Sequence, residues 1–140
     1  METKNIFKSF NENKSIEELK YNMLQFKTRL EELIIECKFF KNLIEASIYK
    51  SNSINLFENL EKFKKDMKCL EKETLELLKD INSHSNSITN KIECEDLVCD
   101  NFFIGSHDRL EEKIQKLFIK SMNLKFKWFQ YLESVFKVKF

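Results

Sequence analysis

The sequence predicts an all-α protein: an elongated antiparallel three-helix bundle with coiled-coil-like heptad packing. The 140-residue chain contains one glycine and no proline, the residues that usually interrupt helices and shape loop-rich folds. Its apolar residues recur at alternating gaps of three and four over long stretches, the spacing that holds one side of a helix against its neighbours. A chain of this length is typical of one domain, so we expect a single bundle.

We expect residues 1–14 to form a short N-terminal arm and residues 15–140 to form the bundle. The first apolar pattern begins directly after the arm. Ser15 and Glu18 have the spacing of a capping box, which predicts that a helix begins there. The apolar positions then alternate by three and four for more than four heptads. We therefore expect a first helix over about residues 15–49.

The second apolar pattern, residues 56–81, is out of phase with the first, so one straight helix cannot hold both patterns on one face. A turn over residues 50–55, which are rich in Ser and Asn, resolves this conflict. A second helix is therefore expected over about residues 54–83.

Apolar periodicity fails over residues 84–106, which predicts an irregular connector. The single glycine, Gly105, comes shortly before Asp108, whose spacing to Glu111 again fits a helix cap. A third helix is therefore expected over about residues 107–138.

The third helix carries two apolar stripes. The first has the three-four spacing of a bundle seam and consists of Leu110, Ile114, Leu117, Ser121, Leu124, Trp128, Tyr131, Val135 and Val138. The second lies on the opposite face and consists of Ile119, Met122, Phe126, Phe129 and Phe136. A helix that is apolar on two sides must be covered on both. We predict that the second stripe is an interface with another copy of the chain or with a partner protein, the alternative being cover by Ile6, Phe7 and Phe10 of the arm.

Charge in the final segment suggests another class of partner. Residues 113–140 contain seven lysines and one acidic residue, interleaved with aromatic side chains. This mixture is typical of helices that bind membrane surfaces or polyanions, so a peripheral membrane or polyanion binder is an alternative function. The chain has only two arginines, Arg29 and Arg109, and no nucleic-acid-reading motif, which argues against nucleic acid. Bases toward the end of a helix also complement its dipole, without any partner.

The connector and the first residue after it hold the candidate metal ligands, which are His84, Cys94, Cys99 and His107. An antiparallel hairpin would bring the two histidines together, so a metal-binding bundle is a second alternative. The two cysteines are five residues apart and each histidine stands alone, which is not the usual ligand spacing of zinc sites. The preferred interpretation has no metal and no other cofactor.

Catalytic patterns are missing from the sequence. No serine lies in a Gly-x-Ser-x-Gly context, and no cysteine has a histidine, the usual base for a thiol, at helical spacing. We therefore predict a non-enzymatic protein with no catalytic residue and no small-molecule substrate. The N-terminal residues lack the apolar run of an export signal, and no run reaches the about 18 apolar residues of a membrane span. These features predict a cytoplasmic protein with free thiols.

Three short segments carry a resemblance to other proteins: Glu36-Cys-Lys-Phe39-Phe40, the isolated His84, and His107-Asp-Arg-Leu-Glu111. Together they resemble small uncharacterised helical proteins of flavobacterial type. The richness in Lys, Asn, Ile and Phe fits an AT-rich genome of that kind. The resemblance covers about half of the chain and implies no particular activity.

Overall fold

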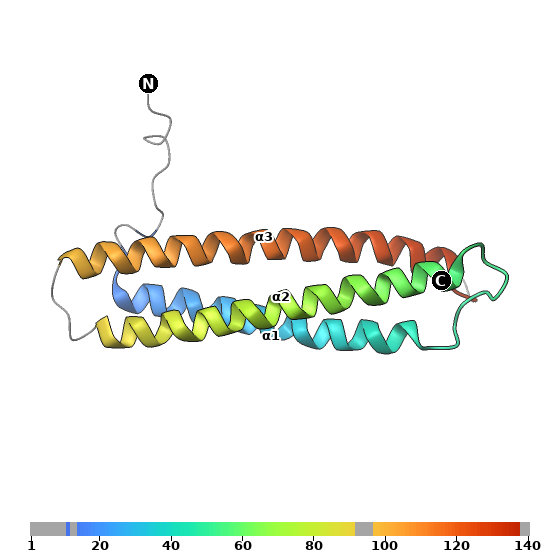
Figure 1. Cartoon of the computed structure of the whole chain (residues 1–140), viewed down its shortest axis with the longest axis horizontal. Coiled ribbons are helices and arrows are strands. Elements are labelled where there is room, and N and C mark those ends of the chain that lie inside the picture. Colours follow the sequence, from blue (N-terminus) through green and yellow to red (C-terminus); the bar gives the residue numbers. More distant parts are fainter. Residues whose placement is uncertain (1–10, 12–13, 92–96, 138–140) are drawn as a thin grey trace, which may run out of the picture.

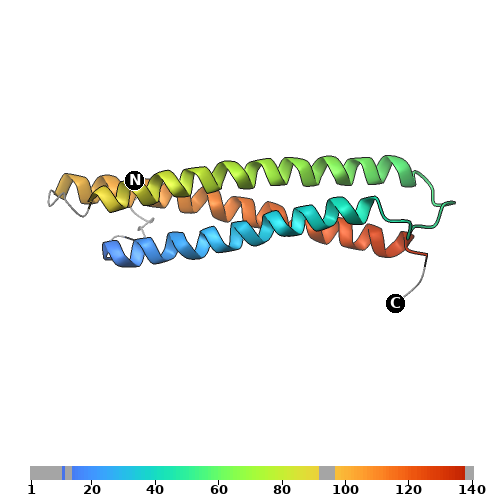
Figure 2. The same cartoon turned by 90° about the horizontal axis from the view of Figure 1, so that it is seen from below.

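The computed structural model describes residues 11, 14–91 and 97–137. Three helices make up most of this part of the chain: α1 (Ile16–Ile44), α2 (Leu56–Lys91) and α3 (Leu97–Val135). They lie side by side in an elongated bundle in which α1 and α3 run in one direction and α2 runs in the other (Figures 1 and 2). The predicted all-α three-helix bundle is confirmed.

The start of α1 is the capping box that the sequence predicts. The Ser15 hydroxyl accepts a hydrogen bond from the Glu18 backbone N–H at 3.2 Å, and the Ser15 backbone N–H donates to the Glu18 carboxylate at 3.2 Å. Each bond satisfies an N–H that the first turn of a helix leaves without an intrahelical partner. The helix therefore begins where its local sequence dictates.

Replacing Ser15 by alanine is expected to lower the free energy of unfolding by about 1 kcal/mol, because it leaves a first-turn N–H without its acceptor. Urea denaturation followed by circular dichroism measures this loss. Ser83→Ala, an exposed change inside α2, is the matched control and should cause no loss, since alanine is the better helix former there. Equal stability of Ser15→Ala and the unmodified protein would contradict the role of the cap.

The end of α1 differs from the prediction, because the helix stops at Ile44 instead of near residue 49. Tyr49 is buried in the core, and its hydroxyl donates to the Leu43 carbonyl. The neighbouring backbone pairs with the end of α3: the Lys50 N–H donates to the Val135 carbonyl and the Lys137 N–H donates to the Ile48 carbonyl, both at 2.8 Å. These bonds require extended backbone over residues 48–50, so tertiary pairing ends the helix before its apolar periodicity does.

The prediction of an irregular connector over residues 84–106 is wrong. Helix α2 continues to Lys91 and α3 already begins at Leu97, so most of that segment is helical. The buried face of α2 continues from Ile81 to His84, and that of α3 runs back from Leu110 to His107. An apolar pattern cannot show this extension, because the side chains that continue the packed seam are polar. The predicted end of the third helix at residue 138 is also too late, since α3 ends at Val135.

The core lies along the axis of the bundle. Helix α1 packs against α2, and α2 packs against α3. The largest buried side chain, Trp128 of α3, stacks on Phe63 of α2 with ring centroids 5.0 Å apart. The ring centroid of Phe63 also lies 6.0 Å from that of Phe40 in α1, so one aromatic cluster joins all three helices. This packing positions the surface where α1 and α3 meet.

Candidate functional site

The second stripe of α3 faces solvent in the single chain. The exposed fractions are 56% for Ile119, 62% for Met122, 64% for Phe126 and 48% for Phe129. Gaps of three and four residues place these side chains on one face of the helix. Large apolar side chains scattered singly over a surface are ordinary, but a continuous stripe of four marks a site of interaction or of aggregation.

Phe136 does not belong to this surface, which corrects the predicted stripe. Its ring stacks on Tyr49 with centroids 6.1 Å apart, and the side chain is half-buried. The prediction assumed that the helix continued to residue 138, whereas α3 ends at Val135 and the backbone of Phe136 bridges that of Tyr49. The helical spacing that would place Phe136 in the stripe therefore does not apply.

Helix α1 extends the exposed surface through Phe39, which sequence reasoning missed. Phe39 is 59% exposed, and its ring lies 5.7 Å from Phe40. Phe40 in turn meets Phe129 of α3 edge to face at 5.4 Å. The only signal for Phe39 is its position outside the apolar seam and next to Phe40. Phe39, Ile119, Met122, Phe126 and Phe129 are called the apolar surface below.

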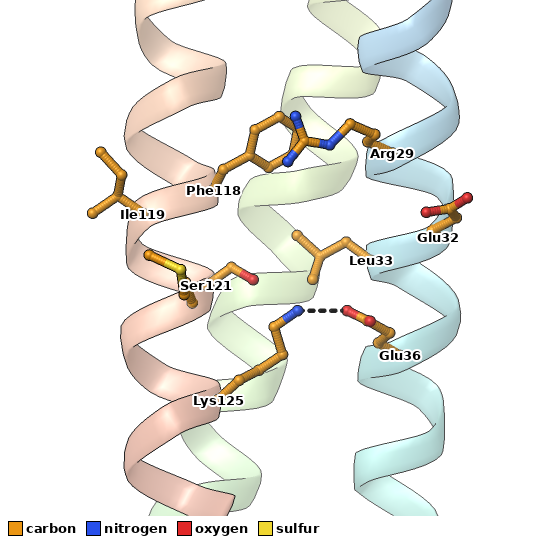
Figure 3. Close-up of a pocket in the computed structure, with 9 residues that line it drawn as sticks. Arg29, Glu32, Leu33, Glu36, Phe118, Ile119, Ser121 and Lys125 are labelled. Atoms are coloured by element: carbon orange, nitrogen blue, oxygen red, sulfur yellow. Dashed lines mark hydrogen bonds and ion pairs between the residues drawn. The ribbon is translucent and has the colours of Figure 1, made fainter.

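A cavity of about 390 Å³ opens between α1 and α3 beside the apolar surface (Figure 3). Its lining consists of Arg29, Glu32, Leu33, Glu36, Phe118, Ile119, Ser121, Met122 and Lys125. Leu33 and Phe118 point into the space between the two helices (Figure 3). The Arg29 guanidinium lies over the Phe118 ring, 3.9 Å from its centroid, a cation–π arrangement. The cavity therefore has apolar walls near its middle and charged groups at its edges.

The small size of one seam residue explains why this cavity exists. Ser121 occupies a position of the first stripe and is 3% exposed, whereas Leu117 and Trp128, one and two turns away on the same stripe, are large. A serine leaves unfilled volume where leucine or an aromatic side chain would pack. Next to it, the Lys125 ammonium bridges to the Glu36 carboxylate at 2.9 Å and joins the two helices (Figure 3).

The lysines of α3 are largely paired with acidic side chains of the same bundle. Lys125 pairs with Glu36 of α1, Lys120 pairs with Glu73 of α2, and Lys116 pairs with Glu112 of α3 at 3.1 Å. Lys127 lies over the Trp128 ring, 4.9 Å from its centroid. The exposed residues one turn from the apolar surface on α3 are the uncharged Gln115, Asn123 and Gln130, together with Lys116, which is paired with Glu112, and Glu133. The basic charge around the apolar surface is therefore largely balanced by carboxylates.

The two histidines meet, as the hairpin prediction expects. His84 Nε2 and His107 Nδ1 are hydrogen-bonded at 3.1 Å, and both side chains are buried between α2 and α3. Cys94 lies outside the described residues, and Cys99 lies in the first turn of α3 with a side chain outside the described set. Within residues 11, 14–91 and 97–137, no three metal-binding side chains come together. Two imidazoles alone fall short of the four ligands of a structural zinc site.

Burial keeps this histidine pair neutral at pH 7. Desolvation lowers the pKa of His84, and it lowers the pKa of His107 to about 4, with the nearby His84 adding to the effect. Asp108 raises the His107 pKa and Lys14 lowers it, both less strongly. The Nε2 atom of His107 is buried and has no hydrogen-bond partner in the part of the chain that the structure describes. The pair is thus a polar cluster that tolerates protonation poorly.

A residue of the N-terminal arm packs beside the histidines. Asn11 is fully buried, and its amide donates to the Asp108 carboxylate at 2.6 Å and to the Glu111 carboxylate at 3.3 Å. The Lys14 ammonium donates to the Asn11 carbonyl oxygen at 3.0 Å. These bonds attach the end of the arm to α3 at Asp108, directly after His107, and at Glu111, one turn further along the helix.

The two described cysteines lie in different surroundings. Burial raises the pKa of the Cys37 thiol to about 11, and the carboxylates of Glu71 and Glu36 add to the shift. Cys37 is therefore a protonated core side chain at neutral pH, not a thiolate. Cys69 is exposed and unpaired on α2.

Among the described helices, none is both long and apolar enough to cross a bilayer. Comparison with known proteins adds no relative: no family model, no curated protein and no solved structure matches this chain.

Proposed function

We propose that the protein works by association, without catalysis, and that its partner is a second copy of the same chain bound through the apolar surface. The observation that carries the proposal is the continuous exposure of Ile119, Met122, Phe126 and Phe129 on α3, extended onto α1 by Phe39. Aromatic residues and methionine are enriched in protein interfaces, and charged residues are depleted from interface cores.

The size of the apolar surface suits an interface. Five side chains of roughly 150–250 Å² each, about half of it exposed, present on the order of 500 Å² of apolar area. A standard interface buries about 800 Å² on each partner, of which about 56–65% is apolar. The apolar surface thus matches the apolar share of one side of a specific dimer.

The charges around the surface favour a second copy over a membrane or a polyanion. Two identical faces bring like-charged rims together, so a basic rim would oppose self-association and would favour anionic lipid instead. Here Gln115, Asn123 and Gln130 beside the stripe are uncharged, and the nearby Lys116, Lys120 and Lys125 are paired with carboxylates of the bundle. In a dimer of two copies, none of these three lysines would therefore meet the same lysine of the other copy as an unpaired charge.

We expect the unmodified protein to have a mass in solution of twice the 16.9 kDa of one chain. Met122→Glu and Phe126→Glu should each reduce this mass to that of a single chain. A carboxylate in a desolvated apolar interface costs several kcal/mol, so we expect the dimer to be weakened by about 100-fold or more. Sedimentation equilibrium or light scattering on a sizing column measures the change.

The matched control is Leu75→Glu, which places the same charge at a 48% exposed position of α2, away from the apolar surface. This variant should remain a dimer. Thermal melts followed by circular dichroism should show that all three variants stay helical. An unmodified chain that is monomeric at roughly 100 μM, well above the Kd of a specific dimer, would overturn the proposal and point to a different protein as the partner.

A further inference from the structure

We infer that the N-terminal arm folds back along α3 and covers Ile119 and Met122 of its own chain, so that a second copy must displace it. As a form of regulation, this cover rests on the proposed self-association. Residues 1–10 lie outside the described residues, and so does the predicted cover by apolar side chains of the arm. The described residue Asn11 fixes the point of the bundle from which this segment extends.

Asn11 is attached to the same face of α3 as the apolar surface. Its side chain is fully buried and donates to the carboxylates of Asp108 and Glu111. In the sequence, Ile119 follows Asp108 by eleven residues, and Met122 follows Glu111 by the same number. Eleven residues are about three turns, which bring an α-helix back to the same side. The segment before Asn11 therefore starts on the line of helix surface that carries the exposed stripe.

The reach of the segment matches the distance to the stripe. Helical residues rise about 1.5 Å each, which puts Ile119 about 16 Å along the axis from Asp108. An extended backbone spans about 3.3 Å per residue. Phe7 and Ile6 come four and five residues before Asn11 in the sequence, so they reach about 13 and 16 Å from it. Two large apolar side chains of the arm can therefore lie at the start of the exposed stripe.

The turn at Asn11 favours this route. The Lys14 N–H donates to the Asn11 carbonyl at 3.1 Å, which closes a turn between the arm and α1. Helix α1 runs alongside α3 in the same direction (Figure 1). Because a turn reverses the chain, the segment before it can run back along α3 toward the apolar surface. On the way it passes the uncharged Gln115 and the Glu112 carboxylate, which is paired with Lys116. No unpaired charge among these residues has to be covered.

Attachment to the same chain strengthens a contact that would be weak between separate molecules. A segment on a short flexible linker meets its site at an effective concentration of about a millimolar. Contact of Ile6 and Phe7 with the half-exposed Ile119 and Met122 then covers the surface for part of the time. A second copy binds only the chains whose surface is open, so the apparent Kd of the dimer is raised once for each copy. The arm thus sets the concentration at which the protein dimerises.

Disulfide trapping within one chain tests the cover, in the full chain with every cysteine except the buried Cys37 changed to serine. Lys4→Cys, about 23 Å of extended chain from Asn11, is expected to cross-link to Asn123→Cys, which is exposed beside the stripe. The matched control pairs Lys4→Cys with Lys72→Cys, an exposed position at the same level of the bundle on α2, and should cross-link several times less. Dilute protein isolates cross-links within one chain, and a non-reducing gel shows their single-chain mass.

The double variant Ile6→Ser/Phe7→Ser removes the apolar side chains that would make the contact. It should lower the cross-link to Asn123→Cys to the level of the control. Without the added cysteines, it should lower the Kd of the dimer by about 10-fold, the factor expected if the arm covers each copy about two thirds of the time. Lys4→Ser/Asn5→Ser, a polar change in the same segment, should leave the Kd unchanged. Sedimentation equilibrium measures both values.

The outcomes separate this inference from the proposed function. Equal cross-linking of Lys4→Cys to Asn123→Cys and to Lys72→Cys would overturn the inference, while the dimer itself would stand. A dimer whose Kd is not lowered by Ile6→Ser/Phe7→Ser would also overturn it. A chain that stays monomeric but forms the specific cross-link would overturn the proposed function and leave the cover by the arm standing.

Discussion

Replacing Trp128 by alanine is expected to lower the free energy of unfolding by about 3–5 kcal/mol, a large fraction of the total stability of about 5–15 kcal/mol typical of a domain. Trp128 is 2% exposed, stacks on Phe63 at 5.0 Å and meets Tyr131 edge to face at 5.8 Å. Its removal leaves a void at the centre of the aromatic cluster that joins the helices. Urea denaturation at one fixed protein concentration measures the loss, because self-association would make apparent stability depend on concentration.

Trp128→Phe is the matched control for this prediction. It keeps an aromatic ring against Phe63 but removes the indole N–H, which donates to the Asp66 carboxylate at 2.9 Å. Asp66 is only half-buried, so water can replace the lost donor, and we expect a smaller loss of about 1–2 kcal/mol. A Trp128→Ala protein within about 1 kcal/mol of the unmodified one would show that the cluster does not hold the bundle together.

Lowering the pH from 7 to 4 is expected to destabilise the protein by about 3 kcal/mol through His107. Burial lowers the His107 pKa from 6.5 to about 4, so between these values the unfolded chain binds a proton that the folded chain does not. The stabilisation is therefore complete above about pH 6.5 and is lost as the pH falls toward 4. The lowered pKa of His84 acts in the same direction. Urea denaturation at a series of pH values measures the slope.

The double variant His84→Leu/His107→Leu is the test of this assignment. Replacing both hydrogen-bonded partners by apolar side chains avoids leaving one of them unsatisfied, and it also removes the unpartnered Nε2 of His107. We expect stability at pH 7 to be little changed and the slope between pH 6.5 and 5 to disappear. A variant with the same slope as the unmodified protein would show that other groups, such as carboxylates, cause the pH dependence.

Local sequence was sufficient for several features. The capping box of Ser15 and Glu18 starts α1 through contacts within one turn, and the apolar spacing places three helices in one bundle because that spacing directly encodes which side of a helix is buried. The same spacing also identified Ile119, Met122, Phe126 and Phe129 as a stripe apart from the seam, and they are exposed. Their role as an interface remains a proposal.

Contacts between distant segments decided the rest. The backbone near Tyr49 pairs with the end of α3. Because of this pairing, helix α1 ends at Ile44 and Phe136 does not lie in the second stripe of α3. The connector is mostly helical because His84 and His107 satisfy each other inside the bundle, a hydrogen bond between residues 23 positions apart. The sequence by itself thus determined which faces of the helices are apolar, since that is a local periodicity. Only the tertiary structure decided where the helices stop, which polar groups are buried, and that a cavity lies beside the apolar surface, because each depends on side chains that meet only after the helices pack.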